Sequence, residues 1–213
     1  MNTTCAGSAP TTSSARRNIS AHYDLGNDLF AAFLDERMVY SCAYFPDPAA
    51  TLEQAQLAKL DRICGRLRLG PENHLLEIGT GWGGMATHAA RRCGCRVTTT
   101  TISREQFELA TQRVRDAGLE DQVTVLLRDY RDLEGRFDRL VSVEMIEAVG
   151  WQYFDHFFRR CDELLSDDGL MLLQAITIDD GIYEIEKGAK SFANTHVFPG
   201  GWIWVLRFNN GIT

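Results

Sequence analysis

The residues best suited to hold a ligand lie between Leu75 and Gly84. An apolar run, Leu75–Ile78, ends in four glycines within six residues, and the stretch that follows has the pattern of a helix. A strand, a glycine turn and a helix open a βαβ unit, in which a nucleotide-like ligand commonly binds at the turn. Gly79 and Gly81 can adopt positive φ and carry no Cβ that would hold a ligand away. The alternative is a tight turn that binds nothing.

The glycine spacing alone does not identify the ligand. Gly79, Gly81 and Gly84 satisfy the dinucleotide fingerprint G-x-G-x-x-G, which is a weak signal by itself. That fingerprint expects an acidic residue about 20 positions on, at the end of the next strand, to hold the ribose. The next predicted strand, Arg96–Thr100, is followed by no carboxylate before Glu105. S-adenosyl-L-methionine, which has an adenosine and a sulfonium but no phosphate, fits better, and the stretch resembles motif I of the class I methyltransferases.

Strand and helix patterns alternate through the middle of the chain. Apolar runs typical of strands occur at Leu75–Ile78, Arg96–Thr100, Val123–Leu127, Arg139–Val143 and Leu170–Ile176. Helical patterns lie near Met85–Cys93, Arg104–Ala117 and Tyr153–Leu165. This alternation predicts a three-layer α/β/α Rossmann-like fold, with a mostly parallel sheet covered on both faces. Ligands in such sheets bind at the carboxyl ends of the strands.

The stretch before this core is predicted to be largely helical. A short helix covers Asp28–Leu34, with Asn27 as its N-cap. The aromatic stretch Val39–Phe45 is either a functional loop or a strand that packs on the core. Thr51–Gln54 is a capping box that opens a long helix.

Composition excludes several classes of function. The 213 residues are 45% hydrophobic, enough for one domain with an ample core. The net charge of −7 argues against nucleic acid as a partner, because a phosphate backbone attracts a basic face. No apolar run approaches the ~18 residues of a membrane span, and no signal peptide is visible. The six cysteines and five histidines show no disulfide framework and no metal-ligand spacing, so we expect a reduced cytoplasmic compartment and no metal.

Five motifs occur in collinear order between about Asn18 and Gly201. They are Tyr40–Phe45, Leu76–Gly83, Arg128–Asp132, Phe137–Gly150 and Val197–Gly201. This set resembles the cyclopropane-fatty-acyl-phospholipid synthases and the mycolic acid cyclopropane synthases. The resemblance implies transfer of a methylene group from S-adenosyl-L-methionine to the cis double bond of an unsaturated phospholipid acyl chain. It implies a cytoplasmic protein without a transmembrane segment that works at the surface of the inner membrane, and it leaves a homodimer open.

Composition and the resemblance together divide the chain into segments, with the Ser/Thr/Ala-rich residues 1–17 lying before the matching region. A disordered tail, 1–17, precedes a methyltransferase domain, 18–213, made of a helical lid region (18–70), a Rossmann-like core (71–178) and a truncated or divergent C-terminal segment (179–213). The family sheet looks like seven strands, the last antiparallel, whereas this sequence predicts five and at most one more at Trp202–Phe208. We therefore expect a sheet incomplete at its C-terminal end, with apolar surface exposed around Trp202, Trp204 and Phe208.

The implied reaction makes its own chemical demands. An alkene that attacks the sulfonium methyl group becomes a carbocation, and a base must then remove a proton for the ring to close. A dry pocket and electron-rich faces stabilise the cation. In the family the base resembles a bound bicarbonate, held by the backbone near a cysteine, a glutamate, a histidine and a tyrosine.

Three residues match this catalytic set. Cys42 lies in the matching Tyr-Ser-Cys motif, and its alternative is a buried small hydrophobe. Glu147 matches the glutamate after the fourth strand, while Glu144 in the same turn is a rival carboxylate that we expect to be exposed. Gln174 occupies the histidine position, where it can hydrogen-bond a small anion but cannot relay a proton. The family's tyrosine has no counterpart in this sequence.

Seven residues match positions that bind the cofactor in the family: Tyr40, Ser41, Gly79, Gly81, Thr101, Gln106 and Tyr130. The first two match the contacts to the methionine end, and the glycines match the turn. Thr101 and Gln106 match the pair that replaces the usual ribose carboxylate. Gln106 has an alternative role as a helix cap, because Ser103–Gln106 is also a capping box. Tyr130 matches an aromatic residue that stacks on adenine, with core packing as its alternative.

Two rival functions stay open. Plain methyl transfer to a lipid or a small molecule uses the same scaffold, and Gln174 weakens the base relay. A catalytically inactive cofactor-binding fragment is the non-enzyme rival. Ring closure removes the alkene whereas a methylated alkene keeps its unsaturation, so product analysis separates the first two, and turnover against binding separates the third.

Overall fold

The computed structural model describes residues 27–176 in full, together with the backbone of two strands at 194–198 and 201–205. The expected tail at 1–17 and the first part of the lid, 18–26, lie outside the described residues. The apolar surface expected around Trp202, Trp204 and Phe208 also rests on side chains outside them. Among the described residues, no helix is both long enough and apolar enough to cross a membrane.

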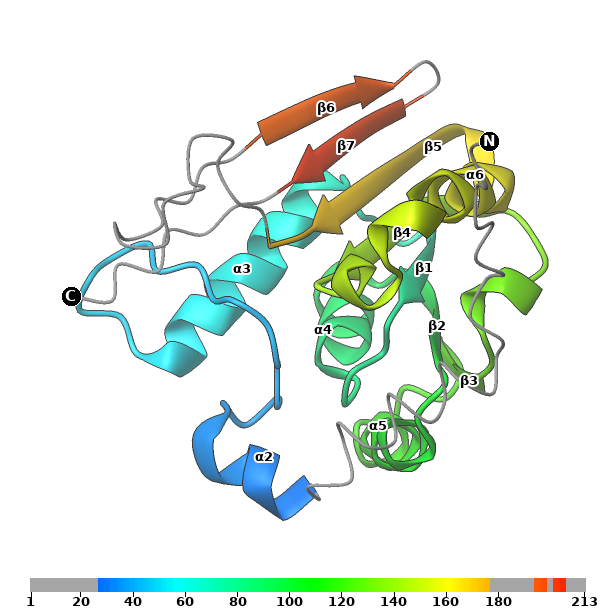
Figure 1. The fold of residues 1–213 in the computed structure, drawn as a ribbon. Coiled ribbons are helices and arrows are strands. Elements are labelled where there is room, and N and C mark those ends of the chain that lie inside the picture. Colours follow the sequence, from blue (N-terminus) through cyan, green and yellow to red (C-terminus); the bar gives the residue numbers. More distant parts are fainter. Residues whose placement is uncertain (1–26, 177–193, 199–200, 206–213) are drawn as a thin grey trace, which may run out of the picture.

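A predominantly parallel sheet forms the middle layer of the fold (Figure 1). In the described part of the chain, seven strands follow the order β3-β2-β1-β4-β5-β7-β6. Neighbouring strands are parallel, except for the antiparallel pair β6 and β7. The expected Rossmann-like α/β/α class is confirmed. The bounds are β1 His74–Ile78, β2 Arg96–Thr101, β3 Val123–Leu127, β4 Phe137–Val143, β5 Leu165–Gln174, β6 Asn194–Phe198 and β7 Gly201–Val205.

The last two strands differ from expectation. The prediction of at most six strands is wrong, because Val197–Gly201, whose Pro-Gly-Gly is a typical turn signal, contributes to two strands. β6 ends at Phe198 and β7 begins at Gly201. β7 lies parallel to β5 through Leu173 and Val205, so the antiparallel strand is β6 at the edge of the sheet.

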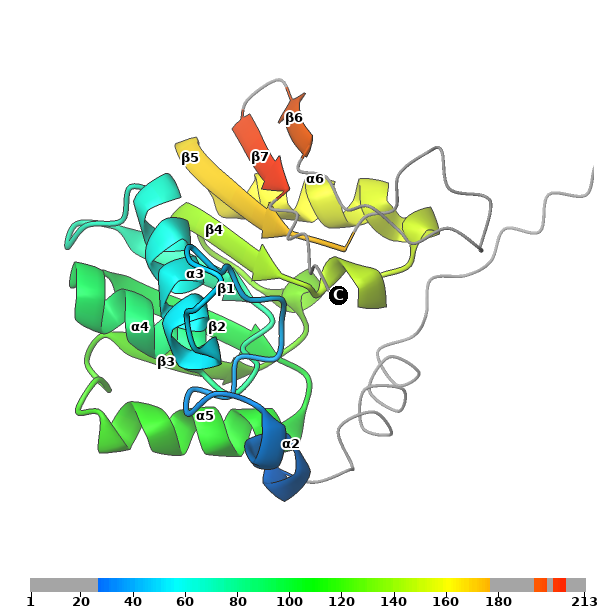
Figure 2. The same cartoon turned by 90° about the vertical axis from the view of Figure 1, so that its left-hand side faces the viewer.

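Helices cover both faces of the sheet (Figure 2). One apolar core takes side chains from α3, α4 and α5, and the other takes them from α6. Because side chains alternate across a strand, β1 sends Leu75 into the first core and Leu76 into the second. The bounds are α2 Asn27–Phe33, α3 Leu52–Arg66, α4 Gly84–Cys93, α5 Arg104–Asp116 and α6 Phe154–Leu164, with short 3-10 helices η1 Tyr130–Asp132, η2 Ile146–Ala148 and η3 Trp151–Tyr153.

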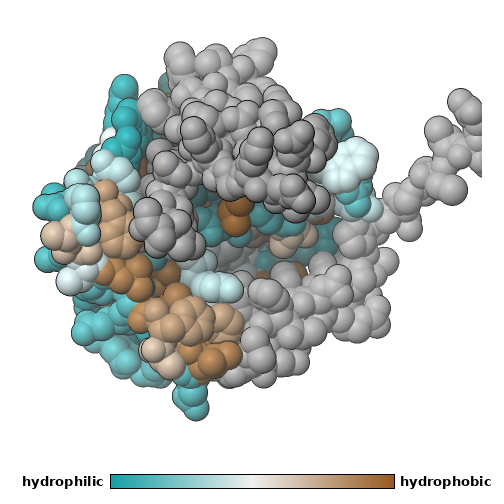
Figure 3. Space-filling model, turned by 60° about the vertical axis from the view of Figure 1, so that its left-hand side comes forward, coloured by the Kyte–Doolittle hydropathy of each residue, from teal (hydrophilic) through white to brown (hydrophobic). Residues whose placement is uncertain are grey.

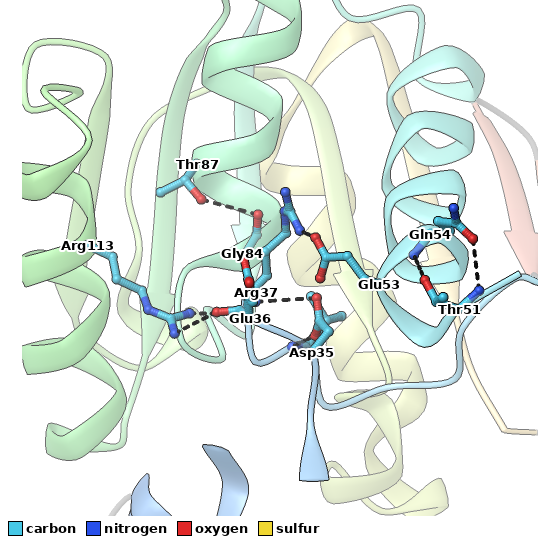
Figure 4. Close-up of polar contacts among 10 residues, drawn as sticks. Asp35, Glu36, Arg37, Thr51, Glu53, Gln54, Gly84, Thr87 and Arg113 are labelled. Atoms are coloured by element: carbon cyan, nitrogen blue, oxygen red, sulfur yellow. Dashed lines mark hydrogen bonds and ion pairs between the residues drawn. The ribbon is translucent and has the colours of Figure 1, made fainter. Parts of the chain in front are cut away.

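Capping side chains set where the N-terminal helices begin. Thr51 Oγ1 accepts from Gln54 N at 3.2 Å and Gln54 Oε1 accepts from Thr51 N at 2.9 Å, so the predicted capping box of α3 is confirmed (Figure 4). Asn27 is the first residue of α2 rather than its N-cap. Its side chain serves another purpose, because Asn27 Oδ1 accepts from Trp82 Nε1 at 2.8 Å.

The connection between α2 and α3 is a loop, not a strand, and polar contacts hold it in place (Figure 4). Asp35 Oδ1 accepts from Val39 N at 2.8 Å. Arg113 of α5 donates from Nη1 to Arg37 O at 2.7 Å, and the Arg37 side chain forms an ion pair with Glu53 of α3. These contacts tie the loop to two helices that pack on the same face of the sheet.

Candidate active site

The glycine turn after β1 has a backbone that glycine adopts most readily. The φ angle is +102° at Gly79 and +52° at Gly81, as expected. The N–H groups of Gly79 and Thr80 both donate to Thr100 O, at 3.0 and 3.1 Å, which pins the turn to β2. A Cβ on Gly81 would meet no atom within 4 Å, whereas one on Gly79 would lie 3.3 Å from Met145 Cβ. The turn therefore has open space at Gly81 and touches the chain after β4 at Gly79.

Thr101 and Gln106 meet at the end of β2. Both are buried, and Thr101 Oγ1 donates to Gln106 Oε1 at 2.8 Å. The cap of α5 is Ser103, whose Oγ accepts from Gln106 N at 3.3 Å, while Ser103 N donates to Thr101 Oγ1 at 3.1 Å. The Gln106 side chain thus bonds Thr101 instead of capping the helix. The predicted pair is brought together, and its role in cofactor binding stays a prediction.

Tyr130 begins η1, the element that follows β3 along the chain. Its ring lies 5.4 Å from that of Phe157 on α6, edge to face, and it packs against the second core. Burial raises the pKa of the Tyr130 phenol to about 12. Core packing, the plain alternative, accounts for these contacts, and stacking on adenine stays a prediction.

The segment Val39–Ala43, which holds three predicted site residues, lies against a polar side of α3. Gln56 Nε2 donates to Val39 O at 3.1 Å and to Ser41 O at 2.9 Å. Lys59 Nζ donates to Ser41 Oγ at 2.6 Å. Gln56 and Lys59 are buried, with 2% and 0% of their surface exposed. α3 therefore holds both the backbone of the segment and the Ser41 hydroxyl.

Lys59 places a buried cation under this segment. Desolvation lowers the pKa of the Lys59 ammonium from 10.5 to about 8. Three neighbours oppose that shift, with the Glu144 carboxylate first, then Cys42 and Asp35. Lys59 therefore stays protonated at pH 7, and Glu144 is the strongest of the charges that favour its protonated form.

Cys42, Glu144 and Gln174 meet at the carboxyl edge of the sheet. Cys42 N donates to Glu144 Oε1 at 2.9 Å, and Gln174 Nε2 donates to the same oxygen at 2.7 Å. Gln174 Nε2 also donates to Cys42 O at 3.2 Å. The expectation that Glu144 is exposed is wrong, because its side chain is partly buried and binds two of the predicted catalytic residues.

Glu147 reaches a different partner. It is exposed in η2, and its Oε1 accepts from Ile176 N at 2.5 Å, just beyond β5. The structure thus brings Cys42 and Gln174 together with Glu144, not Glu147, as the carboxylate that both contact. The catalytic role of Glu147 stays a prediction.

Apolar side chains are exposed next to the segment (Figure 3). Leu29 and Phe33 of α2, with Tyr40 and Phe45, are each about half exposed. The Tyr40 ring lies 6.3 Å from that of Phe33 and 6.4 Å from that of the buried Trp82. Because Trp82 belongs to the glycine-rich stretch, this apolar surface adjoins the turn.

Comparison with known proteins identifies the family. The family model for mycolic acid cyclopropane synthetase matches residues 11–207. The chain belongs to this family. The expected relationship is thereby confirmed.

Several known proteins are similar to this chain in sequence or structure. The tuberculostearic acid methyltransferase UfaA1 of Mycobacterium tuberculosis is 45% identical over 194 residues, which are 88% of this chain and 45% of that protein. The cyclopropane-fatty-acyl-phospholipid synthase of Escherichia coli (strain K12) is 46% identical over 186 residues, 87% of this chain and 46% of that protein. The mycolic acid cyclopropane synthase CmaA1, solved in complex with SAH and CTAB, matches with a TM-score of 0.71 and 38% identity over 74% of this chain and 55% of that one. This chain spans about half the length of each of these three relatives.

Sequence analysis does not predict two residues of the candidate site, Lys59 and Glu144. Lys59 lies four positions from both Ala55 and Ile63, on the buried stripe of α3. A lysine at an apolar-stripe position is a signal that could reveal it. Glu144 has no comparable signal, because a charged residue after a strand can face either solvent or the site.

Proposed function

We propose that this member of the mycolic acid cyclopropane synthetase family transfers a methylene group from S-adenosyl-L-methionine to the cis double bond of an unsaturated phospholipid acyl chain. The observation that carries the proposal is that the open glycine turn adjoins the group formed by Cys42, Glu144 and Gln174. Gly79 lies against Met145, the residue after Glu144. A one-carbon donor held at the turn is then close to groups that can organise proton removal.

The residues around the turn fit this cofactor. Gly81 leaves open space, and the neutral Thr101–Gln106 pair lies where a dinucleotide site carries its ribose carboxylate. When bound, S-adenosyl-L-methionine supplies an electrophilic methyl group. The glycine turn, Thr101 and Gln106 would hold its adenosine half, and Tyr40 and Ser41 would hold its methionine end. The solved complex of CmaA1 with SAH supports the choice of cofactor.

Cys42, Gln174 and Glu147 are proposed to organise the chemistry. Cys42 offers a backbone N–H and Gln174 a side-chain N–H, both aimed at one point. Gln174 can orient an anion there but has no proton to relay. Glu147 matches the family's glutamate. Bicarbonate is the base that the resemblance implies, but Glu144 already accepts hydrogen bonds from both of these donors.

A lipid substrate agrees with the surface next to the turn. The exposed side chains of Leu29, Phe33 and Phe45 offer apolar contacts for an acyl chain, and the alkene must react away from water. We place the reaction at a membrane surface, since that is where a phospholipid is available. A homodimer and a cytoplasmic location stay predictions.

Plain methyl transfer is the second candidate. The chain is 45% identical to a relative named as a methyltransferase and 46% identical to one named as a cyclopropane synthase, so identity does not separate the two reactions. Gln174 in place of histidine also favours the simpler reaction.

Product analysis tests both candidates. The purified chain is mixed with monounsaturated phospholipid vesicles and S-adenosyl-L-methionine that carries a CD3 group. Cyclopropanation is expected to give a lipid with a CD2 group and no alkene, whereas methylation gives the added carbon with the unsaturation retained. Binding of S-adenosylhomocysteine by calorimetry without any product would instead support a catalytically inactive fragment. Tight binding of NAD without response to S-adenosyl-L-methionine would overturn the cofactor assignment.

A further inference from the structure

The carboxylate of Glu144 is anchored through one oxygen. Oε1 accepts from Cys42 N at 2.9 Å and from Gln174 Nε2 at 2.7 Å. Oε2 makes no hydrogen bond to any residue within 27–176. A carboxylate held in this way keeps the lone pairs of its second oxygen for another partner.

The two donors are oriented so that only an acceptor fits between them. Nε2 of Gln174 faces Cys42 O and Glu144 Oε1, and both of these atoms are acceptors, so the orientation of the amide is chemically determined. Gln174 is fully buried, which prevents it from exchanging these bonds for water. The Cys42 N–H is held by the bonds from Gln56 to the carbonyl groups of the same segment.

The backbone at Glu144 adopts a conformation that favours glycine. Its φ is +47°, which costs a non-glycine residue about 1 kcal/mol or more. The N–H of Glu144 donates to Gln174 O at 2.8 Å, so main chain and side chain both bind this residue to the end of β5. Backbone strain at a residue whose side chain lies where two hydrogen-bond donors converge is a reason to assign that residue a function.

A buried cation lies near the Glu144 carboxylate. Among the neighbours that raise the pKa of the Lys59 ammonium, Glu144 contributes most, ahead of Cys42 and Asp35. The Glu144 carboxylate is held at the point where the donors of Cys42 and Gln174 converge.

We infer that the Glu144 carboxylate takes the place of the bound bicarbonate that the family resemblance implies, and that it is the proton acceptor of the reaction. This inference rests on the proposed function. The donors that would hold bicarbonate already hold a carboxylate that belongs to the chain. A protein with this arrangement needs no bicarbonate.

The methylene transfer conserves atoms and electrons without a reactant beyond the alkene, S-adenosyl-L-methionine and Glu144. The π electrons of the alkene form a bond to the transferred methyl carbon, and sulfur keeps the electrons of the broken C–S bond. Oε2 of Glu144 then takes a proton from the transferred carbon. The electrons of that C–H bond close the ring on the cationic carbon. The neutral carboxyl group of Glu144 finally releases the proton to water.

Bicarbonate binding tests the inference without relying on turnover. The probe is [13C]bicarbonate, observed by 13C NMR line broadening with the full chain. Wild type is expected to bind none, because Glu144 fills the place. Glu144→Gly is expected to bind it, since glycine suits the positive φ and leaves the two donors open. Arg68→Gly, at an exposed residue with φ of +51°, is the matched control and is expected to behave as wild type.

Product formation in buffer depleted of bicarbonate gives the second readout. Wild type is expected to be unaffected by bicarbonate, while Glu144→Gly loses at least ~100-fold and recovers when bicarbonate is added. Glu144→Gln keeps the size and the acceptor of the side chain but not its basicity, so it is expected to be inactive and not rescued. Circular dichroism shows whether each variant is folded.

Three results would overturn the inference. They are bicarbonate binding by wild type, loss of wild-type activity without bicarbonate, and full activity of Glu144→Gly in its absence. If wild type forms no product at all, the proposed function fails and the proton-transfer role fails with it. In that case the NMR measurement still tests separately whether the Glu144 carboxylate occupies the place where bicarbonate would bind.

Discussion

Glu144 and Glu147 are three positions apart, yet their carboxylates bind different parts of the sheet edge. Glu144 binds Cys42 N and Gln174 Nε2, whereas Glu147 binds Ile176 N. The sequence presents both as acidic residues in one turn. The left-handed backbone at Glu144 distinguishes them, and residue type gives no warning of it, because such a conformation is uncommon for glutamate.

Substitution of Glu147 tests the role that the family resemblance implies. Glu147→Gln removes the charge but keeps an acceptor for Ile176 N. We expect the affinity for S-adenosylhomocysteine, measured by calorimetry, to stay within a few-fold of wild type. Product formation should fall by ~100-fold or more, the scale of lost acid–base organisation. Glu134→Gln, at an exposed glutamate, is the matched control. Wild-type activity in Glu147→Gln would remove this residue from the reaction.

At the scale of elements, α3 both covers the sheet and positions the site. One stripe of the helix buries Ala55, Ile63 and Lys59 together, and the Lys59 ammonium reaches Ser41 Oγ. The energetic cost of burying a cation is visible in its lowered pKa. Burial of Lys59 in this helix therefore lowers stability, while its ammonium group holds the segment Val39–Ala43 in place.

Replacement of Lys59 should change how stability depends on pH. The pKa of Lys59 is about 8 in the folded chain and 10.5 when unperturbed, so the unfolded chain binds more protons between these values. Wild type therefore gains stability from this group as pH rises from 8 to 10.5, and below pH 8 the group contributes no pH dependence. Lys59→Met lacks this gain.

Urea unfolding in reducing buffer measures the effect of Lys59→Met. The free energy of unfolding of wild type, relative to that of Lys59→Met, should increase from pH 8 to 10.5. Below pH 8 this difference should not change with pH. Arg91→Met removes an exposed cation of α4 and should show no such window. Parallel curves for Lys59→Met and wild type would mean that the lysine is not desolvated.

The glycine turn allows a test that separates folding from binding. Gly81 and Gly118 have φ of +52° and +64°, and a Cβ on either would meet no atom within 4 Å. Valine in this conformation costs about 1–2 kcal/mol, so Gly81→Val and Gly118→Val should lose similar stability. Only Gly81→Val should abolish binding of S-adenosylhomocysteine in calorimetry, because Gly118 follows α5 and lies outside the turn. Equal binding by both variants would contradict placement of the cofactor at the turn.

At the scale of the whole molecule, local patterns predict the central sheet and its helices but not the contacts between distant loops. Strand β1 and helix α4 follow from apolar period and glycine spacing, which act over a few residues. Strand β6 is missed because Val197–Gly201 contains Pro-Gly-Gly, a typical turn signal. The bond between Cys42 and Gln174 joins residues 132 positions apart, and only the folded chain reveals it.

Glu77 links the central strand to the stability of the whole chain. It pairs with Thr99 of β2 and Val141 of β4, and only 3% of its surface is exposed. Burial raises the pKa of the Glu77 carboxyl from 4.5 to about 8, although a hydrogen bond with Thr99 opposes the shift. The folded chain thus holds a neutral carboxyl at pH 7, whereas the unfolded chain ionises it.

Unfolding should therefore release the Glu77 proton between pH 4.5 and 8. The folded chain binds more protons in this window, so wild type loses stability as pH rises, by at most about 1.4 kcal/mol per pH unit from this group. The side chain of Glu77→Gln is neutral at every pH. The stability of this variant relative to wild type should therefore increase from pH 4.5 to 8 and stay constant above pH 8. Urea unfolding across this range measures the difference, with Glu72→Gln at an exposed position as the flat control. A constant difference between Glu77→Gln and wild type would show that Glu77 is ionised inside the sheet.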